Sequence, residues 1–215
     1  MDQDFEVSVT AVINCASALS QLGNQVSEKL HLAFLNIEDL GLSKSWIGNQ
    51  YDNVVDSINK YVDELNQLII DASVTIPTNL ELAAKNYAIA DGIPICNANI
   101  NRPTLLEPIL KSNHPEGQII YKEDYIDSAR TVFSQNFIAV DGTLNYYSHV
   151  FSGIIQNEWV GKAMEQYLSA VNKFSKNATA ISNDINNVIK ENINNAQISL
   201  NTAEDTIKGF ITNIN

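Results

Sequence analysis

Hydrophobic residues in the first part of the chain recur in alternating steps of four and three positions. This spacing places them on one face of an α-helix and is typical of helices that pack along a narrow apolar seam. Only Gly23 interrupts the seam, and Gly41 follows its last member, where a helix commonly stops. We therefore predict one long amphipathic helix whose seam is Phe5, Val9, Val12, Ala16, Leu19, Gly23, Val26, Leu30, Ala33, Ile37 and Leu40.

A second apolar stripe follows after the short interval LGLSKSWIGNQ. Its members are Tyr51, Val54, Ile58, Tyr61, Leu65, Leu68 and Ala72. Helices joined by so short a connection normally fold back on each other. The first part of the chain is therefore predicted to form an antiparallel helical hairpin.

The second half of the chain repeats this plan. A third stripe comprises Phe133, Phe137, Val140, Leu144, Tyr147, Phe151 and Ile154, and a fourth comprises Met164, Tyr167, Val171, Phe174, Ala178, Ile181, Ile185 and Val188. Apolar residues then resume one position late, at Ile189, Ile193, Ala196, Leu200, Ala203, Ile207 and Ile211. Such a stutter changes the face that a helix buries. We predict that the last helix leaves the bundle near residue 190 and continues as an amphipathic tail.

The prolines set the boundaries between these regions. All five lie between Pro77 and Pro115, and proline is costly inside helices. The pattern predicts an all-α protein, a four-helix bundle of two antiparallel hairpins that form a pseudo-dimer. An irregular linker, with a short helix or an extended segment near 79–91, joins the hairpins. The predicted domains are a first hairpin over 1–76, a proline-rich linker over 77–121, a second hairpin over 122–190 and a C-terminal helical tail over 191–215.

A Trp-x-Gly motif lies between the two helical patterns of each half. Trp46-Ile47-Gly48 and Trp159-Val160-Gly161 are separated by 113 positions, and the apolar stripes align at the same offset. An indole at a hairpin tip covers the end of an apolar seam. A glycine two residues later permits tight packing or a positive φ where the next helix starts. The chain is therefore predicted to contain an internal repeat, one copy in each half.

The segments SWIGNQYDNVVDSINKYVDEL and EWVGKAMEQYLSAVNKF resemble the turn and second helix of the WXG family of type VII (ESX-type) secretion substrates. The resemblance covers roughly residues 5–74 and 123–190. It implies helix–turn–helix hairpins of about a hundred residues that pair as antiparallel dimers. Family members carry one such unit, whereas this chain carries two. The resemblance therefore implies a monomeric pseudo-dimer, with a homodimer through swapped hairpins as the alternative.

The resemblance also implies an export signal in the tail after the second hairpin. One family form, Tyr-x-x-x-Asp/Glu, is absent, because no such tyrosine follows Tyr167. A second form is hydrophobic-x-x-x-Asp/Glu-x-x-hydrophobic-x-x-x-hydrophobic. The tail matches this spacing, although any amphipathic helix with one acidic residue can do so. The candidate signal residues are Leu200, Glu204, Ile207 and Ile211.

Charge and composition narrow the partners. The net charge of −12 disfavours nucleic acids and anionic membranes, both of which need basic faces. No apolar run approaches the roughly 18 residues of a membrane span, so no stable membrane insertion is expected. The first residues, MDQDFEV, lack the features of a secretory signal peptide. We expect synthesis in the cytoplasm and secretion, or display at the cell surface, by a leaderless route.

Residues suited to catalysis or cofactor binding do not cluster in the sequence. The histidines, His31, His114 and His149, lack metal-ligand spacing, and no phosphate loop or nucleophile motif occurs. Glu123, Asp124 and Asp127 fall where a helix should start, a position that favours negative charge. We predict no catalytic, cofactor-binding or metal-binding residues and no enzymatic activity. Whether Cys15 and Cys96 pair is left open.

The leading functional hypothesis is a type VII secretion substrate or a helical targeting partner (chaperone) of a larger secreted effector. The expected partners are the membrane ATPase of the secretion system and a co-secreted effector or second helical protein. Two alternatives remain at this point: a helical-bundle toxin or pore-forming subunit, and a structural adaptor that is not secreted. The choice between effector and chaperone stays open.

Overall fold

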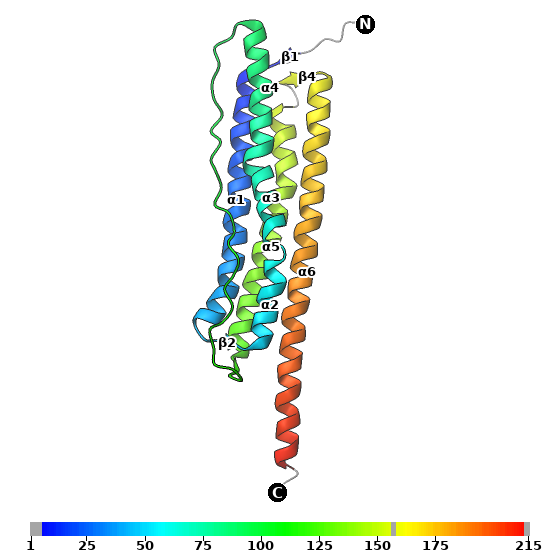
Figure 1. The fold of residues 1–215 in the computed structure, drawn as a ribbon. Coiled ribbons are helices and arrows are strands. Elements are labelled where there is room, and N and C mark those ends of the chain that lie inside the picture. The colour runs from blue at the N-terminus through cyan, green and yellow to red at the C-terminus, as the bar shows by residue number, and fades with distance from the viewer. Residues whose placement is uncertain (1–5, 156–157, 213–215) are drawn as a thin grey trace. The chain divides into compact units, whose positions relative to one another are not determined.

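The computed structural model describes residues 6–155 and 158–212, and these residues are predominantly helical (Figure 1). The protein is all-α, as the sequence predicts, because its described strands are two-residue bridges. None of the described helices is long and apolar enough to cross a membrane. In chain order the elements are β1 (Glu6–Val7), α1 (Val9–Leu42), β2 (Trp46–Ile47), α2 (Asn49–Asn59), α3 (Val62–Ile70), the π-helix η1 (Asp71–Thr75), α4 (Ile76–Asp91), β3 (Ile120–Tyr121), α5 (Glu123–Ile155), β4 (Trp159–Val160) and α6 (Lys162–Thr212).

The seam predicted for the first helix is confirmed. From Val9 to Leu40, every predicted seam residue of α1 is buried. Phe5, the first predicted member, lies outside the described residues. The helix ends at Leu42, one residue beyond the glycine at which we expected it to stop. The period of the apolar residues therefore predicted both the helix and the face that it buries.

Helical structure continues into the region predicted as an irregular linker. Residues 77–91 belong to α4, which ends at Asp91 and is followed by Gly92 in the left-handed conformation (φ 67°). Pro77 lies in the first turn of α4, directly after the π-helix η1. Proline cannot donate to the carbonyl one turn earlier, and the first turn of a helix tolerates it. Of the two possibilities expected near 79–91, a short helix or an extended segment, the structure shows the helix, and residues 93–119 contain no helix or strand.

The chain divides into two compact units. Unit 1 comprises Met1–His31, Asp63–Leu106 and Phe137–Asn183, and unit 2 comprises Leu32–Val62, Glu107–Asn136 and Asp184–Asn215. Each unit combines pieces of both sequence repeats, so α1, α5 and α6 each contribute residues to both units. The predicted domains, in contrast, followed the chain one hairpin after the other.

The core of unit 1 draws on α1, on η1 and α4, on α5, and on α6. A Cβ atom at Gly23 would lie 2.4 Å from the main-chain nitrogen of Ser73, so α1 approaches the π-helix closely at this point. The glycine in the predicted seam is therefore a contact position and not a defect. Buried core residues of unit 1 are Val9, Val12, Ile13, Cys15, Ala16, Leu19, Ala72, Leu80, Ala84, Ala88, Tyr147, Phe151, Ile155, Trp159 and Val171.

The core of unit 2 is built around large aromatic and aliphatic side chains. Tyr51 fills the space over Gly41, where an added Cβ would lie 2.6 Å from the tyrosine hydroxyl oxygen. The buried apolar residues of unit 2 include Phe34, Ile37, Leu40, Trp46, Ile47, Tyr51, Val54, Ile58, Ile126, Phe133, Ile185, Ile189, Ile193 and Ala196.

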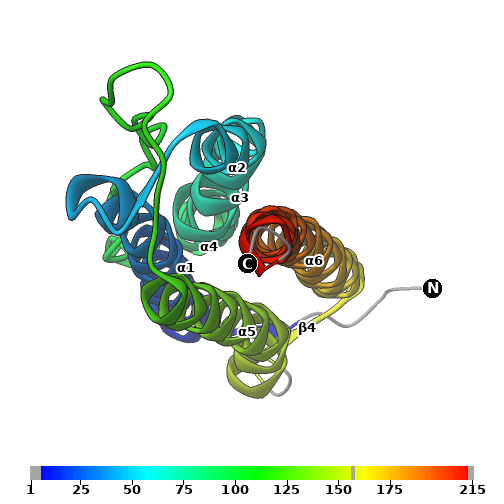
Figure 2. The ribbon, with the colours of Figure 1, turned by 90° about the horizontal axis from the view of Figure 1, so that it is seen from below.

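Helix α6 is one helix from Lys162 to Thr212, seen lengthwise in Figure 1 and end-on in Figure 2. The predicted stutter is present, because its buried positions step by four residues twice in succession, from Ile185 to Ile189 and to Ile193. The helix does not become exposed near residue 190, however. Burial continues to Gln197, and exposed positions predominate only from Ile198 onward. The prediction of a departure near 190 is therefore wrong, because the shifted stripe remains buried.

Candidate functional site

The first Trp-x-Gly motif forms a bridged turn in unit 2. Strand β2 pairs antiparallel with β3, with Trp46 opposite Tyr121 and Ile47 opposite Ile120. Trp46 is fully buried. Gly48 has φ +121° and ψ 179° and precedes the first residue of α2. This region of backbone conformation is essentially restricted to glycine.

The second motif forms the corresponding turn in unit 1. Strand β4 pairs antiparallel with β1, with Trp159 opposite Val7 and Val160 opposite Glu6. Trp159 is buried, and Gly161 has φ +130° directly before α6. Of the two roles that the sequence allowed for these glycines, tight packing or a positive φ, the structure shows a positive φ at both.

The two turns are bridged in a reciprocal manner. Strand β3 directly precedes α5, and strand β1 directly precedes α1, so each turn pairs with the segment that leads into the other repeat. The flanking hydrogen bonds also match: Lys122 N–H donates to Ser45 O in unit 2, and Ser8 N–H donates to Glu158 O in unit 1. Sequence reasoning missed these bridges because two residues are too few to show a strand period.

Aromatic neighbours surround each indole. In unit 2 the ring of Trp46 lies 5.8 Å from that of Tyr51 in an edge-on arrangement. In unit 1 the ring of Trp159 lies 6.0 Å from that of Tyr87 and 5.4 Å from that of Tyr167. Such pairs add stabilisation beyond the burial of their area. Both indoles are therefore packed within a core.

A cavity of about 240 Å³ adjoins the Trp46 turn in unit 2. Leu200 of α6, one of the four candidate signal residues, lines this cavity and is half-buried. The remaining lining residues are Trp46, Ile47, Gly48, Asn49, Gln50, His114, Gly117, Gln118 and Ile119. The structure thus brings Leu200 to the same site as Trp46 and Gly48, although Leu200 lies more than 150 positions after them in the sequence.

The other candidate signal residues lie further along α6. Glu204 is exposed and pairs with Lys208, with 2.9 Å between Oε1 and Nζ. Ile207 is 58% exposed, and the side chain of Ile211 lies outside the described residues. The structure adds Phe210, which is 66% exposed and which sequence reasoning did not single out. Phe210 lies three positions after Ile207, a spacing that could have indicated that both residues share one face of the helix.

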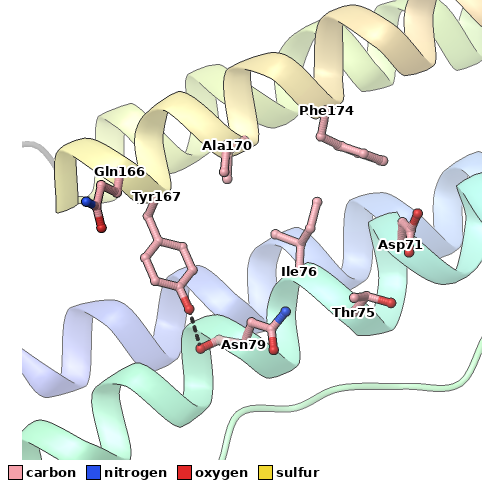
Figure 3. A pocket seen from close by; sticks show the side chains of 9 residues that line it. Asp71, Thr75, Ile76, Asn79, Gln166, Tyr167, Ala170 and Phe174 are labelled. Carbon is pink, nitrogen blue, oxygen red and sulfur yellow. Dashed lines mark hydrogen bonds between the residues drawn. The ribbon is translucent and has the colours of Figure 1, made fainter. Parts of the chain in front are cut away.

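A pocket of about 490 Å³ opens in unit 1 between the η1–α4 segment and α6 (Figure 3). The Tyr167 hydroxyl donates a 2.7 Å hydrogen bond to Asn79 O across it, and burial raises the pKa of that hydroxyl. Asp71 accepts a 2.9 Å hydrogen bond from Gln67. The lining residues are Asp71, Thr75, Ile76, Asn79, Gln166, Tyr167, Ala170, Val171 and Phe174. With one carboxylate and no basic side chain in this lining, the pocket favours a cationic group over an anion.

The histidines and the carboxylates near the start of α5 lie in separate places. His31 contacts Ser27 O at 2.9 Å, and His114 Nε2 lies 3.5 Å from an Asp52 oxygen. The described residues include no group of three potential metal ligands. Glu123 and Asp124 occupy the first turn of α5, and Asp127 pairs with Arg130 at 2.9 Å; His149 is exposed.

The two cysteines are free thiols. Cys15 is buried in the core of unit 1, and burial raises its pKa to about 12. Cys96 is exposed in the segment after α4. The pairing that the sequence left open is therefore not formed, and the Cys15 thiol is not a candidate nucleophile.

Comparisons with known protein families, with curated proteins and with solved structures find no match for this chain. Two features of the chain itself bear on its function: the reciprocal Trp-x-Gly turns and the exposed end of α6.

Proposed function

We propose that the protein is a substrate, or a helical targeting partner of a larger effector, in a type VII secretion system. Two Trp-x-Gly turns support this assignment because they share backbone conformation, bridging and position before a helix. In the WXG proteins that the sequence resembles, one such turn joins the helices of each unit. A chance tryptophan and glycine would not be expected to recur with the same bridge.

The proposed arrangement is an antiparallel pair of helical hairpins within one polypeptide, giving a four-helix pseudo-dimer. Reciprocal bridging supports it: unit 1 joins the start of the first repeat to the turn of the second, and unit 2 joins the turn of the first to the start of the second. Hairpins paired head to tail would make both bridges. Tethering replaces association of two chains by a high effective concentration.

Docking on the secretion ATPase is proposed to use the end of α6. Beyond Gln197 this helix presents exposed apolar side chains, Ile207 and Phe210, next to the carboxylate of Glu204. This exposed face is the observation that carries the proposal. An amphipathic helix of this kind binds by laying its apolar residues into a groove, with positions three and four apart as anchors.

A pair of matched substitutions in α6 tests this role. Ile207→Asp removes a proposed anchor, whereas Ile198→Asp changes a residue of similar exposure, 63% against 58%, outside the signal. Losing one anchor typically costs about 2 kcal/mol or more, roughly 30-fold in affinity. We expect Ile207→Asp to abolish export from a host with a type VII system, while Ile198→Asp is exported normally.

Neither residue is buried, so both variants should unfold at the wild-type temperature. Normal export of Ile207→Asp would refute the signal.

A further inference from the structure

An extended segment, residues 93–106, lies along α1 in unit 1 and contains no helix or strand (green in Figure 1). The α1 residues that contact it follow one another in steps of three and four, so they form a single polar row beside the apolar seam. These residues are Ser17, Ser20, Asn24, Ser27 and His31. We call this row, together with Asn66 of α3, the polar groove.

The first half of the segment is held by hydroxyl, amide and carboxylate groups. The contacts are Asn99 N–H to Ser17 Oγ at 2.9 Å, Asn101 N–H to Ser20 Oγ at 3.3 Å, Asn24 Nδ2 to Asn101 O at 3.4 Å, and Ala98 N–H to Glu81 Oε1 at 2.9 Å. Burial opposes the ionisation of Glu81, but hydrogen bonds from Lys85 and from this N–H hold its pKa below the usual value. Its carboxylate is therefore an effective acceptor for the segment.

The second half of the segment ends at Leu106, whose main-chain N–H and C=O both bond to one side-chain amide. Ser27 Oγ donates to Thr104 O at 2.6 Å, and His31 Nε2 lies 3.2 Å from Leu105 O. The Asn66 amide then accepts from Leu106 N–H at 2.7 Å and donates to Leu106 O at 3.0 Å. A side-chain amide placed in this way substitutes for the main chain of a neighbouring strand. Unit 2 repeats the arrangement, where Asn59 bonds both main-chain groups of Ile109 at 2.8 and 2.9 Å.

Each of these contacts uses a main-chain atom of the segment. The groove therefore recognises an extended backbone and is largely indifferent to the side chains that the backbone carries. One side chain is an exception: Leu106 is 4% exposed, whereas its neighbour Leu105 is 40% exposed. The other residues of 93–105 are exposed or half-buried. Little apolar burial holds the segment, so recognition consists of a hydrogen-bonding row and a single aliphatic anchor.

We propose that the polar groove is a binding site for an extended peptide of another polypeptide, and that residues 98–106 occupy it as an internal ligand. The groove selects an extended, helix-free peptide with an aliphatic side chain at the position of Leu106. Main-chain hydrogen bonds supply affinity, and the anchor supplies specificity, as when a peptide is added along a sheet edge. Tethering gives the internal segment a millimolar-range effective concentration, so an external peptide binds once that segment is displaced. This inference does not depend on the secretion proposal.

The test releases the internal segment and supplies it as a separate molecule. Leu106→Asp in the full chain removes the anchor, and Leu105→Asp is the matched control because Leu105 is not buried. The probe is a fluorescein-labelled, C-terminally amidated peptide, NANINRPTLL, which copies residues 97–106. We expect fluorescence anisotropy to show at least tenfold tighter binding to Leu106→Asp than to wild type or Leu105→Asp. The peptide with aspartate in place of its last leucine should not bind.

Two further chains make the outcome decisive. Adding Asn66→Ala to Leu106→Asp should weaken peptide binding at least tenfold; unchanged binding would place the peptide elsewhere and overturn the proposal. A chain in which a Gly-Ser segment of equal length replaces residues 98–106 leaves the groove empty without a buried charge. Absence of binding to this chain at about 1 mM peptide, with helical circular dichroism retained, would also overturn it.

Discussion

The two Trp-x-Gly turns have the same backbone and different surroundings. In unit 2 the middle residue of the motif, Ile47, is 3% exposed, and the turn adjoins the cavity that Leu200 lines. In unit 1 the middle residue, Val160, is 44% exposed. The indole of unit 2 lies beside the ring of Tyr51, and that of unit 1 lies beside the rings of Tyr87 and Tyr167.

This difference separates what the motif does from what its neighbours do. Tryptophan and glycine fix a bridged turn in both units, through burial of the indole and a conformation that only glycine adopts readily. The middle position is free to vary, and its role depends on the elements packed around it. Leu200, one of the candidate signal residues, lines the cavity beside the Trp46 turn.

The largest expected difference between the turns is at the middle position. Ile47→Ala should lower the free energy of unfolding by about 2–4 kcal/mol, because it leaves a cavity in a buried site. Val160→Ala should change it by less than about 0.5 kcal/mol, because that side chain is nearly half exposed. Urea denaturation followed by circular dichroism measures both. Equal losses would show that the two turns are packed alike.

A smaller effect, shared by both turns, is expected at the glycines. Gly48→Ala and Gly161→Ala should each cost about 1–3 kcal/mol, because both positions have strongly positive φ. At Gly48 an added Cβ would also lie 3.3 Å from Gln118 O. Gly153→Ala is the control: it is helical, has nothing within 4 Å of an added Cβ, and should gain roughly 0.5–1 kcal/mol. A neutral Gly48→Ala would contradict the strain argument.

The smallest expected effect concerns the tyrosines beside the indoles. Burial, and then the carboxylates of Glu38 and Asp52, raise the pKa of Tyr51, whereas burial alone raises that of Tyr167. A tyrosine hydroxyl whose pKa is higher in the folded state than in the unfolded state favours folding at pH values below the unfolded-state pKa of about 10. As the pH rises above about 10, the unfolded state loses this proton first, and this contribution to stability is lost.

Wild type should therefore lose stability between about pH 9.5 and 11, and this loss should be reduced more by Tyr51→Phe than by Tyr167→Phe. Urea midpoints measured at several pH values give the two slopes. The opposite order would mean that Tyr167 lies in the more apolar environment.

Several features could be predicted from the sequence because they follow from local periodicity. The stripe from Val9 to Leu40 predicted both a helix and its buried face, and the prediction holds along the whole described seam. The positive φ of both motif glycines was also expected from their place before a helix. These features depend on the spacing of residues within one segment, which is visible in the chain.

Other features depended on partners distant in the chain. Pro77 suggested the end of a helix, but the π-helix before it lets helical structure continue to Asp91. Asn59 and Asn66 lie seven positions apart on their helical pattern, a signal that could have indicated a polar row. Nothing local, however, specified that their amides bond the main chain of residues 106 and 109.

The amino-acid sequence alone determined the all-α class, the seam of the first helix and the two glycine-dependent turns, because each arises from the local chemistry of a few neighbouring residues. Only the tertiary structure decided that each turn is bridged by the start of the other repeat, that Leu200 reaches the Trp46 cavity and that the extended segment fills the polar groove. These contacts join residues whose separation along the chain leaves no periodic trace. Their formation depends on the packing of whole helices.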